Sequence, residues 1–206
     1  MDRIDGWKQQ QSERGPTVEQ MEIVHSIADA MLYLHAKKIV FRDLKPANIG
    51  FANGVLKLFD FGFAIGLPDK DGDLLLERAG TPRYMAPEVH LPSTGYGLPA
   101  DVYSFGILLW EVCALALPFS HIKSSDEFER AVFLGGERPV VDSNWPTAVK
   151  DLMKSCWSIY PSHRPTMVEV KSTVSSAIPS DKKSPFRRQP SNLRRRRASL
   201  RSSCVW

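Results

Sequence analysis

The stretch at residues 41–48, which reads FRDLKPAN, constrains the fold of this chain more than any other feature, because it is coupled to a second polar motif. Short apolar segments flank the pair Asn53-Gly54, and this pair accepts the positive φ angles that a type I′ turn requires. A tight hairpin at this point would bring Asn48 beside Asp60, the first residue of an Asp-Phe-Gly triplet. The chain is therefore expected to fold so that the two motifs meet at one end of a small sheet.

The residue types in these two motifs suit the transfer of a phosphoryl group. That reaction needs in-line positioning, metal ions that absorb phosphate charge, and a carboxylate that accepts the hydroxyl proton. Asp43 is the candidate for that base, and Lys45 supplies a point charge that would offset negative charge in the transition state. Asn48 and Asp60 offer hard oxygen ligands of the kind that Mg²⁺ accepts. Either motif alone also occurs in ordinary turns, so the prediction depends on their order and on the hairpin between them.

The order of motifs along the chain resembles that of eukaryotic protein kinases. In that family a catalytic aspartate is followed five positions later by an asparagine, then by Asp-Phe-Gly and Ala-Pro-Glu. The matching residues here are Asp43, Asn48, 60–62 and 86–88. The resemblance extends over residues 17–178, which is most of the chain. It implies a transferase that moves the γ-phosphate of ATP to protein hydroxyls, with Mg²⁺ as cofactor.

The resemblance also implies a fold. It predicts a mainly α structure, the larger C-terminal lobe of a kinase, in which a helical bundle carries the catalytic loop and the Asp-Phe-Gly triplet on small β-hairpins. The sequence contains no G-x-G-x-x-G phosphate loop before Phe41 and no V-A-I-K motif, so the smaller N-terminal lobe is predicted to be missing. The expected division is a polar lead at residues 1–16, the lobe at 17–178, and a basic Ser/Pro/Arg tail at 179–206.

Two features favour serine or threonine over tyrosine as the acceptor, and a third indicates the branch of the family. Lys45 resembles the lysine that Ser/Thr kinases place against the transferred phosphate. Thr81, in the segment GTPRYM at residues 80–85, matches the threonine that hydrogen-bonds the catalytic aspartate and lysine in the substrate loop of that group. The segment 156–165, which reads CWSIYPSHRP, resembles the tyrosine-kinase-like branch of Ser/Thr kinases.

Other residues take structural or regulatory roles by resemblance. Asp101 would anchor the backbone of the catalytic loop, although a carboxylate near a helix start can also be a simple cap. Glu88 would form a buried ion pair with Arg164, and removing one member of such a pair typically costs about 3–5 kcal/mol. The residues with implied roles of this kind are Arg42, Phe61, Gly62, Glu88, Asp101 and Arg164.

The segment between the Asp-Phe-Gly triplet and Thr81 has no hydroxyl side chain. Residues 62–80 contain no Ser, Thr or Tyr, so the usual phosphorylation site has no place there. By resemblance, Arg42 would pair with that phosphate. We hypothesise that a carboxylate, either Asp73 or Glu77, pairs with Arg42 instead; the alternative is that the acids simply solvate an exposed loop. The acids of this segment are Asp69, Asp71, Asp73 and Glu77.

Capping signals and periodicity predict the remaining elements. Thr17 and Gln20 fit a capping box that opens a long helix with apolar residues at helical spacing. The polar residues 1–15 are expected to form a frayed helix or a loop. The helix predicted from Asp101 has almost no polar face, so burial on all sides is expected. Further helices are predicted at residues 124–134, 145–157 and 166–178, and short strands at 39–41, 48–51 and 55–59.

Composition and cysteine usage narrow the class of protein. The chain is 43% hydrophobic and 24% charged, which is ordinary for a globular protein. Its three cysteines, Cys113, Cys156 and Cys204, are odd in number and lack zinc-type spacing, so neither a disulfide framework nor a metal site is indicated. This usage favours an intracellular, cytoplasmic location. The longest apolar run, residues 105–119, contains Glu111 and is too short to span a membrane.

The C-terminal tail differs in charge from the rest of the chain. Residues 179–206 hold nine Lys/Arg and one Asp, a net +8, which leaves 18 basic and 22 acidic groups, or −4, in the other 178 residues. With few large apolar residues, the tail is expected to be disordered. The four arginines at 194–197 fit a nuclear-localisation or nucleic-acid patch, but specific nucleic-acid recognition is not expected without interleaved aromatics or a binding fold. Ser199, within RRASL, resembles an acceptor for another, basophilic kinase; a merely solvated basic tail is the third interpretation.

Together these observations predict a protein Ser/Thr kinase with ATP and a protein substrate as partners. Two alternatives stay open: a scaffold or binding module without turnover, and weak nucleotide binding through Asp60 and Asn48 without useful catalysis. The isolated chain is expected to be a poor catalyst, because the sequence lacks the motifs that hold the α- and β-phosphates. The protein substrate, the pathway and the oligomeric state cannot be read from the sequence. The set of residues that favours the enzyme is Asp43, Lys45, Asn48, Asp60 and Thr81.

Overall fold

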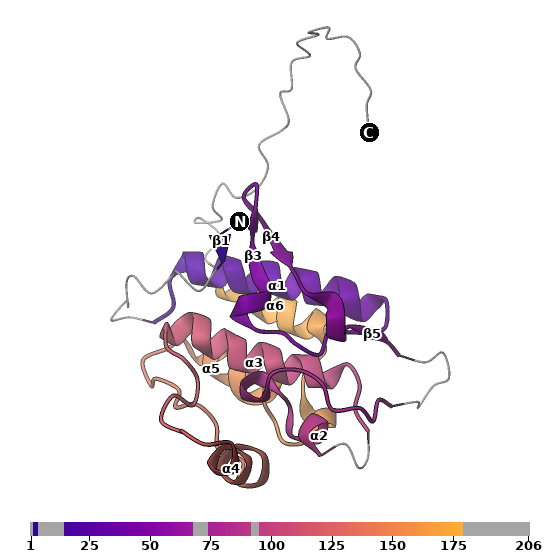
Figure 1. The fold of residues 1–206 in the computed structure, drawn as a ribbon. Coiled ribbons are helices and arrows are strands. Elements are labelled where there is room, and N and C mark those ends of the chain that lie inside the picture. The colour runs from indigo at the N-terminus through magenta and orange to yellow at the C-terminus, as the bar shows by residue number, and fades with distance from the viewer. Residues whose placement is uncertain (1, 4–14, 68–73, 92–94, 179–206) are drawn as a thin grey trace, which may run out of the picture.

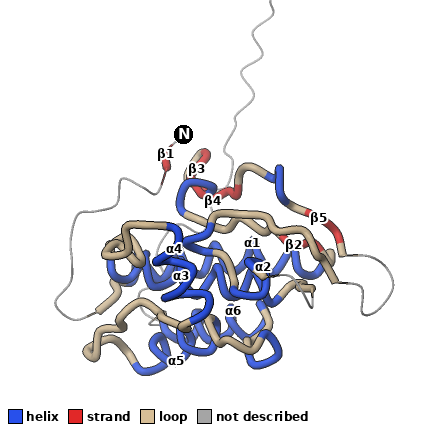
Figure 2. The backbone as a smooth tube through the Cα atoms, turned by 60° about the horizontal axis from the view of Figure 1, so that its bottom comes forward, coloured by secondary structure: helices blue, strands red, loops and turns tan. Residues whose placement is uncertain are grey.

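The computed structural model describes residues 2–3, 15–67, 74–91 and 95–178, which form a mainly helical body with small sheets at one edge (Figures 1 and 2). Its helices are α1 (Val18–Ala36), α2 (Pro87–His90), α3 (Pro99–Ala114), α4 (Ser125–Phe128), α5 (Thr147–Cys156) and α6 (Met167–Ala177). Its strands are β1 (Asp2–Arg3), β2 (Ile39–Val40), β3 (Ile49–Ala52), β4 (Val55–Leu58) and β5 (Ile65–Gly66). Among the described residues, no helix is both long and apolar enough to cross a membrane.

Helices α1 and α6 begin where their capping signals predict. The Gln20 amide donates to Thr17 Oγ1 at 3.2 Å, and the Thr17 amide donates to the Gln20 side-chain oxygen at 2.6 Å. Thr166 and Glu169 form the same reciprocal box at the start of α6. The two helices pack against each other in the helical body (Figure 1). Local sequence therefore determines where these helices start, because each box satisfies backbone groups that the helix itself leaves unpaired.

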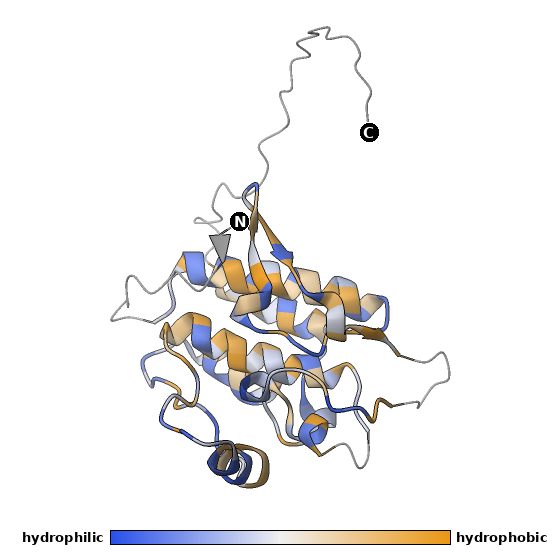
Figure 3. Ribbon diagram, viewed as in Figure 1, coloured by the Kyte–Doolittle hydropathy of each residue, from blue (hydrophilic) through white to orange (hydrophobic). Residues whose placement is uncertain are grey.

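Helix α3 forms the centre of the core, as its apolar sequence predicts. Every residue from 100 to 109 is buried, and apolar colours are prominent along α3 in Figure 3. The helix begins at Pro99, two residues earlier than predicted, because proline is favourable at a first helical position. Helix α5 packs closely on it at Gly106, where a Cβ atom would lie only 2.7 Å from Cys156 Cβ. A glycine is needed there for the two helices to approach.

Strands β3 and β4 form the predicted hairpin. They pair antiparallel, from Ile49 opposite Leu58 at the open end to the turn at Asn53 and Gly54. Both turn residues have positive φ, 53° and 71°, as a type I′ turn requires. The strand order in this sheet is β1-β3-β4, and β2 pairs with β5 in a second sheet.

Two strand predictions need correction. Strand β2 ends at Val40 and excludes Phe41, because the Phe41 amide donates to a side chain of α3 instead of to a strand. The lead was expected to be a frayed helix or a loop, yet Asp2 and Arg3 form β1, which pairs with Phe51 and Gly50 of β3. The open edge of β3 offers backbone groups to any nearby extended segment, and the composition of the lead does not reveal this.

The predicted helix at 124–134 is α-helical only in part. Ser124 accepts from the Glu127 amide at 3.2 Å, as a cap should, but the backbone widens into a π-helical turn over Glu129–Leu134. Aromatic rings pack closely in this segment: the ring centroids of Phe128 and Phe133 lie 5.4 Å apart in an edge-to-face arrangement. The wider turn accompanies this aromatic packing, which no local propensity encodes. Helices α5 and α6 match their predicted ranges to within two residues at each end.

Candidate active site

The polar residues of the segment 41–48, which would be the catalytic loop by resemblance, meet Thr81 in a compact, mostly buried cluster. Asp43, at 3% exposure, lies at its centre. Lys45 Nζ is 2.7 Å from Asp43 Oδ2, and Thr81 Oγ1 donates to Asp43 Oδ1 at 2.7 Å. Asn48 Nδ2 donates to Asp43 Oδ2 and to the Asp43 carbonyl, both at 2.9 Å. Lys45 also donates to Thr81 Oγ1 at 2.8 Å, so the four side chains form one connected network.

The network keeps the central carboxylate charged. Burial by itself would raise the pKa of Asp43, because the charged form loses water. The hydrogen bonds from Lys45, Thr81 and Asn48, together with the Lys45 charge, outweigh burial and hold the pKa of Asp43 below its ordinary value. At neutral pH the group is therefore a carboxylate that accepts hydrogen bonds through both of its oxygens.

Asp101 anchors the backbone of the catalytic loop, as expected from the resemblance. The Phe41 amide donates to Asp101 Oδ2 at 2.8 Å, and the Arg42 amide donates to Asp101 Oδ1 at 2.9 Å. His35 Nε2 lies 3.0 Å from Asp101 Oδ2. Asp101 is fully buried at the third position of α3, where the helix dipole also favours a negative charge. Its carboxylate is thus used for the loop, whereas the N-cap position of α3, Leu98, makes no side-chain cap bond.

A glycine allows the segment that carries Thr81 to approach the catalytic loop. Gly80 has a φ of +104°, in the region that favours glycine, and a Cβ atom there would collide with the carbonyl oxygen of Arg42. Arg42 itself has a φ of 68°. Both unusual backbone conformations lie directly beside Asp43, so the approach of the two segments depends on them.

The Asp-Phe-Gly triplet lies at the open end of the β3–β4 hairpin. The Phe59 amide donates to the Asn48 carbonyl at 2.8 Å, which places Asp60 one residue from that contact, as the hairpin predicts. Asp60 has a φ of 55° and accepts a bond from the Gly62 amide at 3.3 Å. Its side chain is exposed, in contrast to Asp43. Phe61 packs edge-on against Phe41, with ring centroids 5.2 Å apart, while half of its surface stays exposed.

Arg42 binds three groups that follow it in the chain, at Phe63, Glu77 and Tyr96. Its Nε donates to the Phe63 carbonyl at 2.5 Å, and its Nη1 lies 3.4 Å from Glu77 Oε2 and 3.3 Å from the Tyr96 hydroxyl. Tyr96 in turn donates to the Glu77 carbonyl at 2.5 Å. Glu77 is therefore the carboxylate that meets Arg42 among the described residues. The other acids of the segment, at positions 69, 71 and 73, lie outside them.

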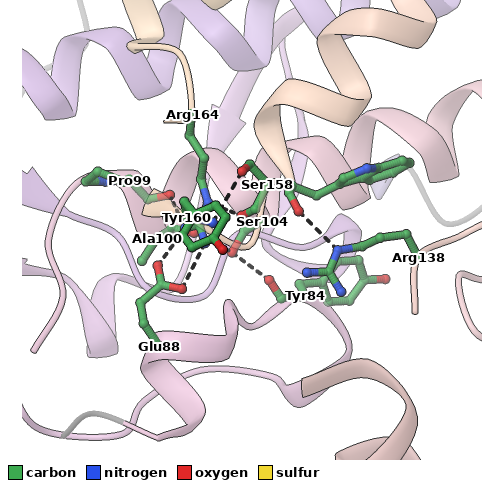
Figure 4. A network of polar contacts seen from close by, with 10 residues as sticks. Tyr84, Glu88, Pro99, Ala100, Ser104, Arg138, Ser158, Tyr160 and Arg164 are labelled. Atoms are coloured by element: carbon green, nitrogen blue, oxygen red, sulfur yellow. Dashed lines mark hydrogen bonds and ion pairs between the residues drawn. The ribbon is translucent and has the colours of Figure 1, made fainter. Parts of the chain in front are cut away.

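The second predicted ion pair is bidentate and joins a buried arginine to a partly buried glutamate (Figure 4). Arg164 Nη1 lies 2.5 Å from Glu88 Oε1, and Nη2 donates to Glu88 Oε2 at 2.9 Å. Arg164 also donates to the Ser158 and Pro99 carbonyls, at 2.8 and 3.0 Å. Through these contacts Arg164 connects α2 with the start of α3 and with the loop before α6. Two further N–H groups of the guanidinium thus donate to backbone oxygens.

Arg164 and a second arginine, Arg138, both lie over the ring of Tyr103. The guanidinium carbons of Arg138 and Arg164 lie 5.0 and 5.2 Å from its ring centroid. Its hydroxyl has no hydrogen-bond partner in the described part of the chain, and burial raises the pKa of Tyr103 to about 12. The ring therefore serves as a cation–π platform that positions both guanidinium groups.

The donor chemistry of the site fits a hard divalent metal. Because the Asn48 amide nitrogen is directed at Asp43, the amide oxygen is left for a ligand, and the exposed Asp60 carboxylate supplies further oxygens. Mg²⁺ is usually held by one or two such protein groups together with phosphate oxygens and water. The described residues contain no cluster of three or more His, Cys, Asp or Glu that could hold a metal alone.

Sequence reasoning missed three residues of this region. His35 belongs to none of the motifs, yet its side chain binds Asp101. Tyr96 and Tyr103 were not singled out, because each acts through partners that are distant in the sequence. The predicted acceptor Ser199 and the arginine cluster at 194–197 lie outside the described residues, as does the rest of the tail after Ile178.

Comparison with known proteins agrees with the resemblance seen in the motifs. Residues 6–174 match the family described as a protein kinase domain. Dual specificity protein kinase shkB of Dictyostelium discoideum is 41% identical over 142 residues, which cover 68% of this chain and 22% of that protein. A putative mitogen-activated protein kinase kinase kinase 7-like protein of Drosophila melanogaster is 39% identical over 153 residues, or 70% of this chain and 38% of that protein. A probable LIM domain-containing serine/threonine-protein kinase of Dictyostelium discoideum is 34% identical over 160 residues, which cover 75% of this chain and 23% of that protein. The matched segment thus spans well under half the length of each of these relatives.

Proposed function

The chain belongs to the protein kinase domain family, and we propose that residues 17–178 form the larger lobe of a Ser/Thr kinase of the tyrosine-kinase-like branch. The reaction is transfer of the γ-phosphate of ATP to a hydroxyl group of a protein. The observation that carries this proposal is the cluster in which Asp43 accepts hydrogen bonds from Lys45, Thr81 and Asn48. The proposed base, the proposed phosphate-facing cation and the proposed metal-ligand amide belong to this one network.

Asp43 is proposed to orient the substrate hydroxyl and to receive its proton. A carboxylate with a lowered pKa is a weak base, so orientation of the hydroxyl is its larger contribution early in the reaction. Lys45 is positioned to stabilise charge on the transferred group, since its ammonium lies within 2.8 Å of both Asp43 and Thr81. Both side chains are fixed by their neighbours before substrate arrives, which limits the entropic cost of positioning.

Asn48 and Asp60 are proposed to hold Mg²⁺ with ATP. When bound, the metal neutralises phosphate charge and fixes the orientation of the transferred group. The hairpin supports this assignment, because it holds the two ligand residues at neighbouring strand ends. Thr81 supports a Ser/Thr acceptor through its hydrogen bond with Asp43, while two of the relatives carry names that state dual specificity and serine/threonine specificity for those proteins.

The test is a phosphorylation assay on the protein isolated from its own source, with Mg·ATP and a mixture of Ser-, Thr- and Tyr-containing peptides. Replacing Asp60 with Ala should abolish turnover, and Asp43→Asn should lower the rate by about 10²–10⁴-fold, as expected for a lost acid–base group. The matched control is Asp151→Asn, an exposed acid on α5, which should leave the rate unchanged. Full turnover in Asp60→Ala would refute the assignment, and product on tyrosine alone would refute the acceptor class.

A second candidate function is that of a binding module without turnover. The face that carries Asp60 exposes Phe61, Phe63 and Ile65. An apolar surface of this kind suits a protein partner. Calorimetric titration with Mg·ATP, combined with the phosphorylation assay, separates the two candidates. The kinase requires both nucleotide binding and turnover, whereas the binding module shows no turnover. The intact mass of the protein from its source, set against 23.2 kDa, shows which chain the assay measures.

We also propose an intracellular location. In the described residues Cys113 and Cys156 are buried free thiols rather than members of a disulfide, and such thiols are typical of a reducing compartment. The arginines at 194–197 make nuclear import the alternative to a cytoplasmic location. Imaging of a tagged protein distinguishes the two locations. If the arginines import the protein into the nucleus, replacing all four with Gln should remove it from the nucleus, whereas a cytoplasmic distribution should not change.

A further inference from the structure

A cavity of about 490 Å³ is lined by α5 and by residues shortly before and after this helix. Its apolar lining consists of Pro139, Val141 and Trp157. Pro139 and Trp157 are buried, so packing fixes this part of the wall. None of the residues that line the cavity belongs to the cluster around Asp43. The volume is typical of a site that takes a small ligand or a few side chains of a partner.

The polar lining of the cavity is basic. Arg138, Lys150 and Lys154 contribute to it, whereas the described residues of the lining include no Asp or Glu. Within the described part of the chain, no ion pair joins any of these three cations to a carboxylate. Arg138 and Lys150 donate to backbone carbonyls, which satisfy donors without neutralising a charge. Three positive charges are therefore gathered around one cavity.

These cations keep donors for a ligand, although two of them already hold backbone groups. Arg138 uses Nε and Nη1 for its three carbonyls, and within the described residues no acceptor meets its Nη2. Lys150 gives one of its three N–H groups to the Ser143 carbonyl at 2.7 Å, and Lys154 is exposed one turn further along α5. Burial lowers the pKa of Arg138, so its charge is held at a cost. A bound anion would reduce that cost, because it supplies the opposite charge that the lining lacks.

We propose that this cavity binds an acidic segment of a partner protein, with a phosphate or carboxylate group set against Arg138, Lys150 and Lys154. Charge complementarity favours this occupant: the site is positive although residues 1–178 together carry −4, so the positive charge is local to it. Val140 lies between two lining residues and is 87% exposed, so apolar surface continues beyond the cavity. Trp110 Nε1 donates to the Val140 carbonyl at 2.8 Å and holds this segment in place. The continuation suits a peptide with an apolar side chain beside its acidic group, rather than a free anion.

The test uses a fluorescein-labelled peptide, Ala-Glu-Val-X-Leu-Glu-Ala, in which X is phosphoserine, glutamate or glutamine. Its anisotropy on titration with the full-length protein should show saturable binding of the two acidic forms, about tenfold tighter than that of the glutamine form. Lys154→Glu should weaken this binding about tenfold, because a repulsion replaces an attraction, and a high salt concentration should weaken it as well. Tighter binding of the phosphoserine form would identify phosphate as the ligand group, and equal binding of both acidic forms would identify a carboxylate. The peptide has no free hydroxyl, so the result is independent of phosphoryl transfer.

The matched control is Lys57→Glu, the same charge reversal at an exposed lysine of β4 that does not line the cavity. It should bind the peptide as the wild type does, and thermal unfolding should show that all variants are folded. As a second readout, peptide binding should change the tryptophan emission of the wild type, and Trp157→Phe should lose this change. Equal affinity in the wild type and Lys154→Glu would overturn the proposal, because attraction to the basic tail alone would give that result. An equal loss in Lys57→Glu would overturn it too, as would equally tight binding of the glutamine form or an undiminished emission change in Trp157→Phe.

Discussion

Two arginine–carboxylate pairs hold the segment between the Asp-Phe-Gly and Ala-Pro-Glu motifs, and they differ mainly in burial. At the end of the segment, Glu88 and Arg164 expose 11% and 0% of their side chains and meet at 2.5 Å. In its middle, Glu77 exposes 78% of its side chain and meets Arg42 at 3.4 Å. The chemistry is the same, yet only the first pair is shielded from water. Burial therefore makes one pair a structural anchor and leaves the other an adjustable contact.

The same comparison explains how the segment can be held without a phosphate. The Arg42 side chain is largely buried, at 7% exposure, and is already bound to the Phe63 carbonyl, so the cation stays in place. Glu77 reaches it from an exposed position, with the Tyr96 hydroxyl bridging to the Glu77 backbone. We infer that this carboxylate takes the place that a phosphate would otherwise occupy. A single carboxylate brings less charge than a phosphate, so the contact is weaker and easier to release.

The largest effect is expected from breaking the buried pair. Arg164→Ala should lower the free energy of unfolding by about 3–5 kcal/mol, because Glu88 is left as a buried, unpaired charge. Urea denaturation of the single variants and of the double variant Arg164→Ala/Glu88→Gln measures this. The double variant should recover part of the loss. A loss below 1 kcal/mol for Arg164→Ala would mean that the pair is not an anchor.

An intermediate effect is expected at the residue that holds the Arg42 backbone. Asp101→Ala removes the acceptor for the Phe41 and Arg42 amides and should cost about 1–3 kcal/mol. Hydrogen exchange provides the specific measurement, because those two amides should lose protection more than amides of the α3 interior. Ser104→Ala, on the same helix, is the matched control; it should leave those amides protected. Uniform loss of protection across α3 would instead indicate a purely helical role for Asp101.

A smaller, pH-dependent effect is expected from Asp43. Its pKa in the folded protein lies below that of an unfolded aspartate, about 3.9, so its contribution to stability is complete above that pH. The contribution should be lost as the pH falls through the folded pKa. Unfolding measured between pH 2 and 6 should show this dependence, and Thr81→Ala, which removes one of the bonds that lower the pKa, should shift it to higher pH. An identical profile in Asp43→Asn would assign the acid sensitivity to other groups.

The smallest effect on stability is expected at the exposed pair. Glu77→Gln should change the free energy of unfolding by at most about 1 kcal/mol, because water screens the contact. Its consequence should appear in activity, which should fall if this carboxylate positions the segment. Phosphatase treatment of the wild-type protein should leave activity unchanged, since residues 62–80 hold no phosphorylatable hydroxyl. Loss of activity on treatment would contradict the replacement of a phosphate by Glu77.

Much of the architecture could be predicted because the signals are local. The box of Thr17 and Gln20 marks the start of α1, and the Asn53-Gly54 turn specifies the hairpin that brings Asn48 next to Asp60. The residue types alone also indicate oxygen ligands for a metal. The strand β1 and the π-helical turn at Glu129–Leu134 could not be predicted, because each depends on a surface supplied by another part of the chain.

The sequence by itself determined which residues are available for phosphoryl transfer and in which order they occur. Only the tertiary structure decided that His35 and Asp101 hold the loop together, that Glu77 rather than another described acid meets Arg42, and that Glu88 is shielded while Glu77 is not. The physical reason is that the strength of a charge pair depends on how much water the surrounding fold excludes. Exclusion of water is a property of packed segments and cannot be read from one stretch of sequence.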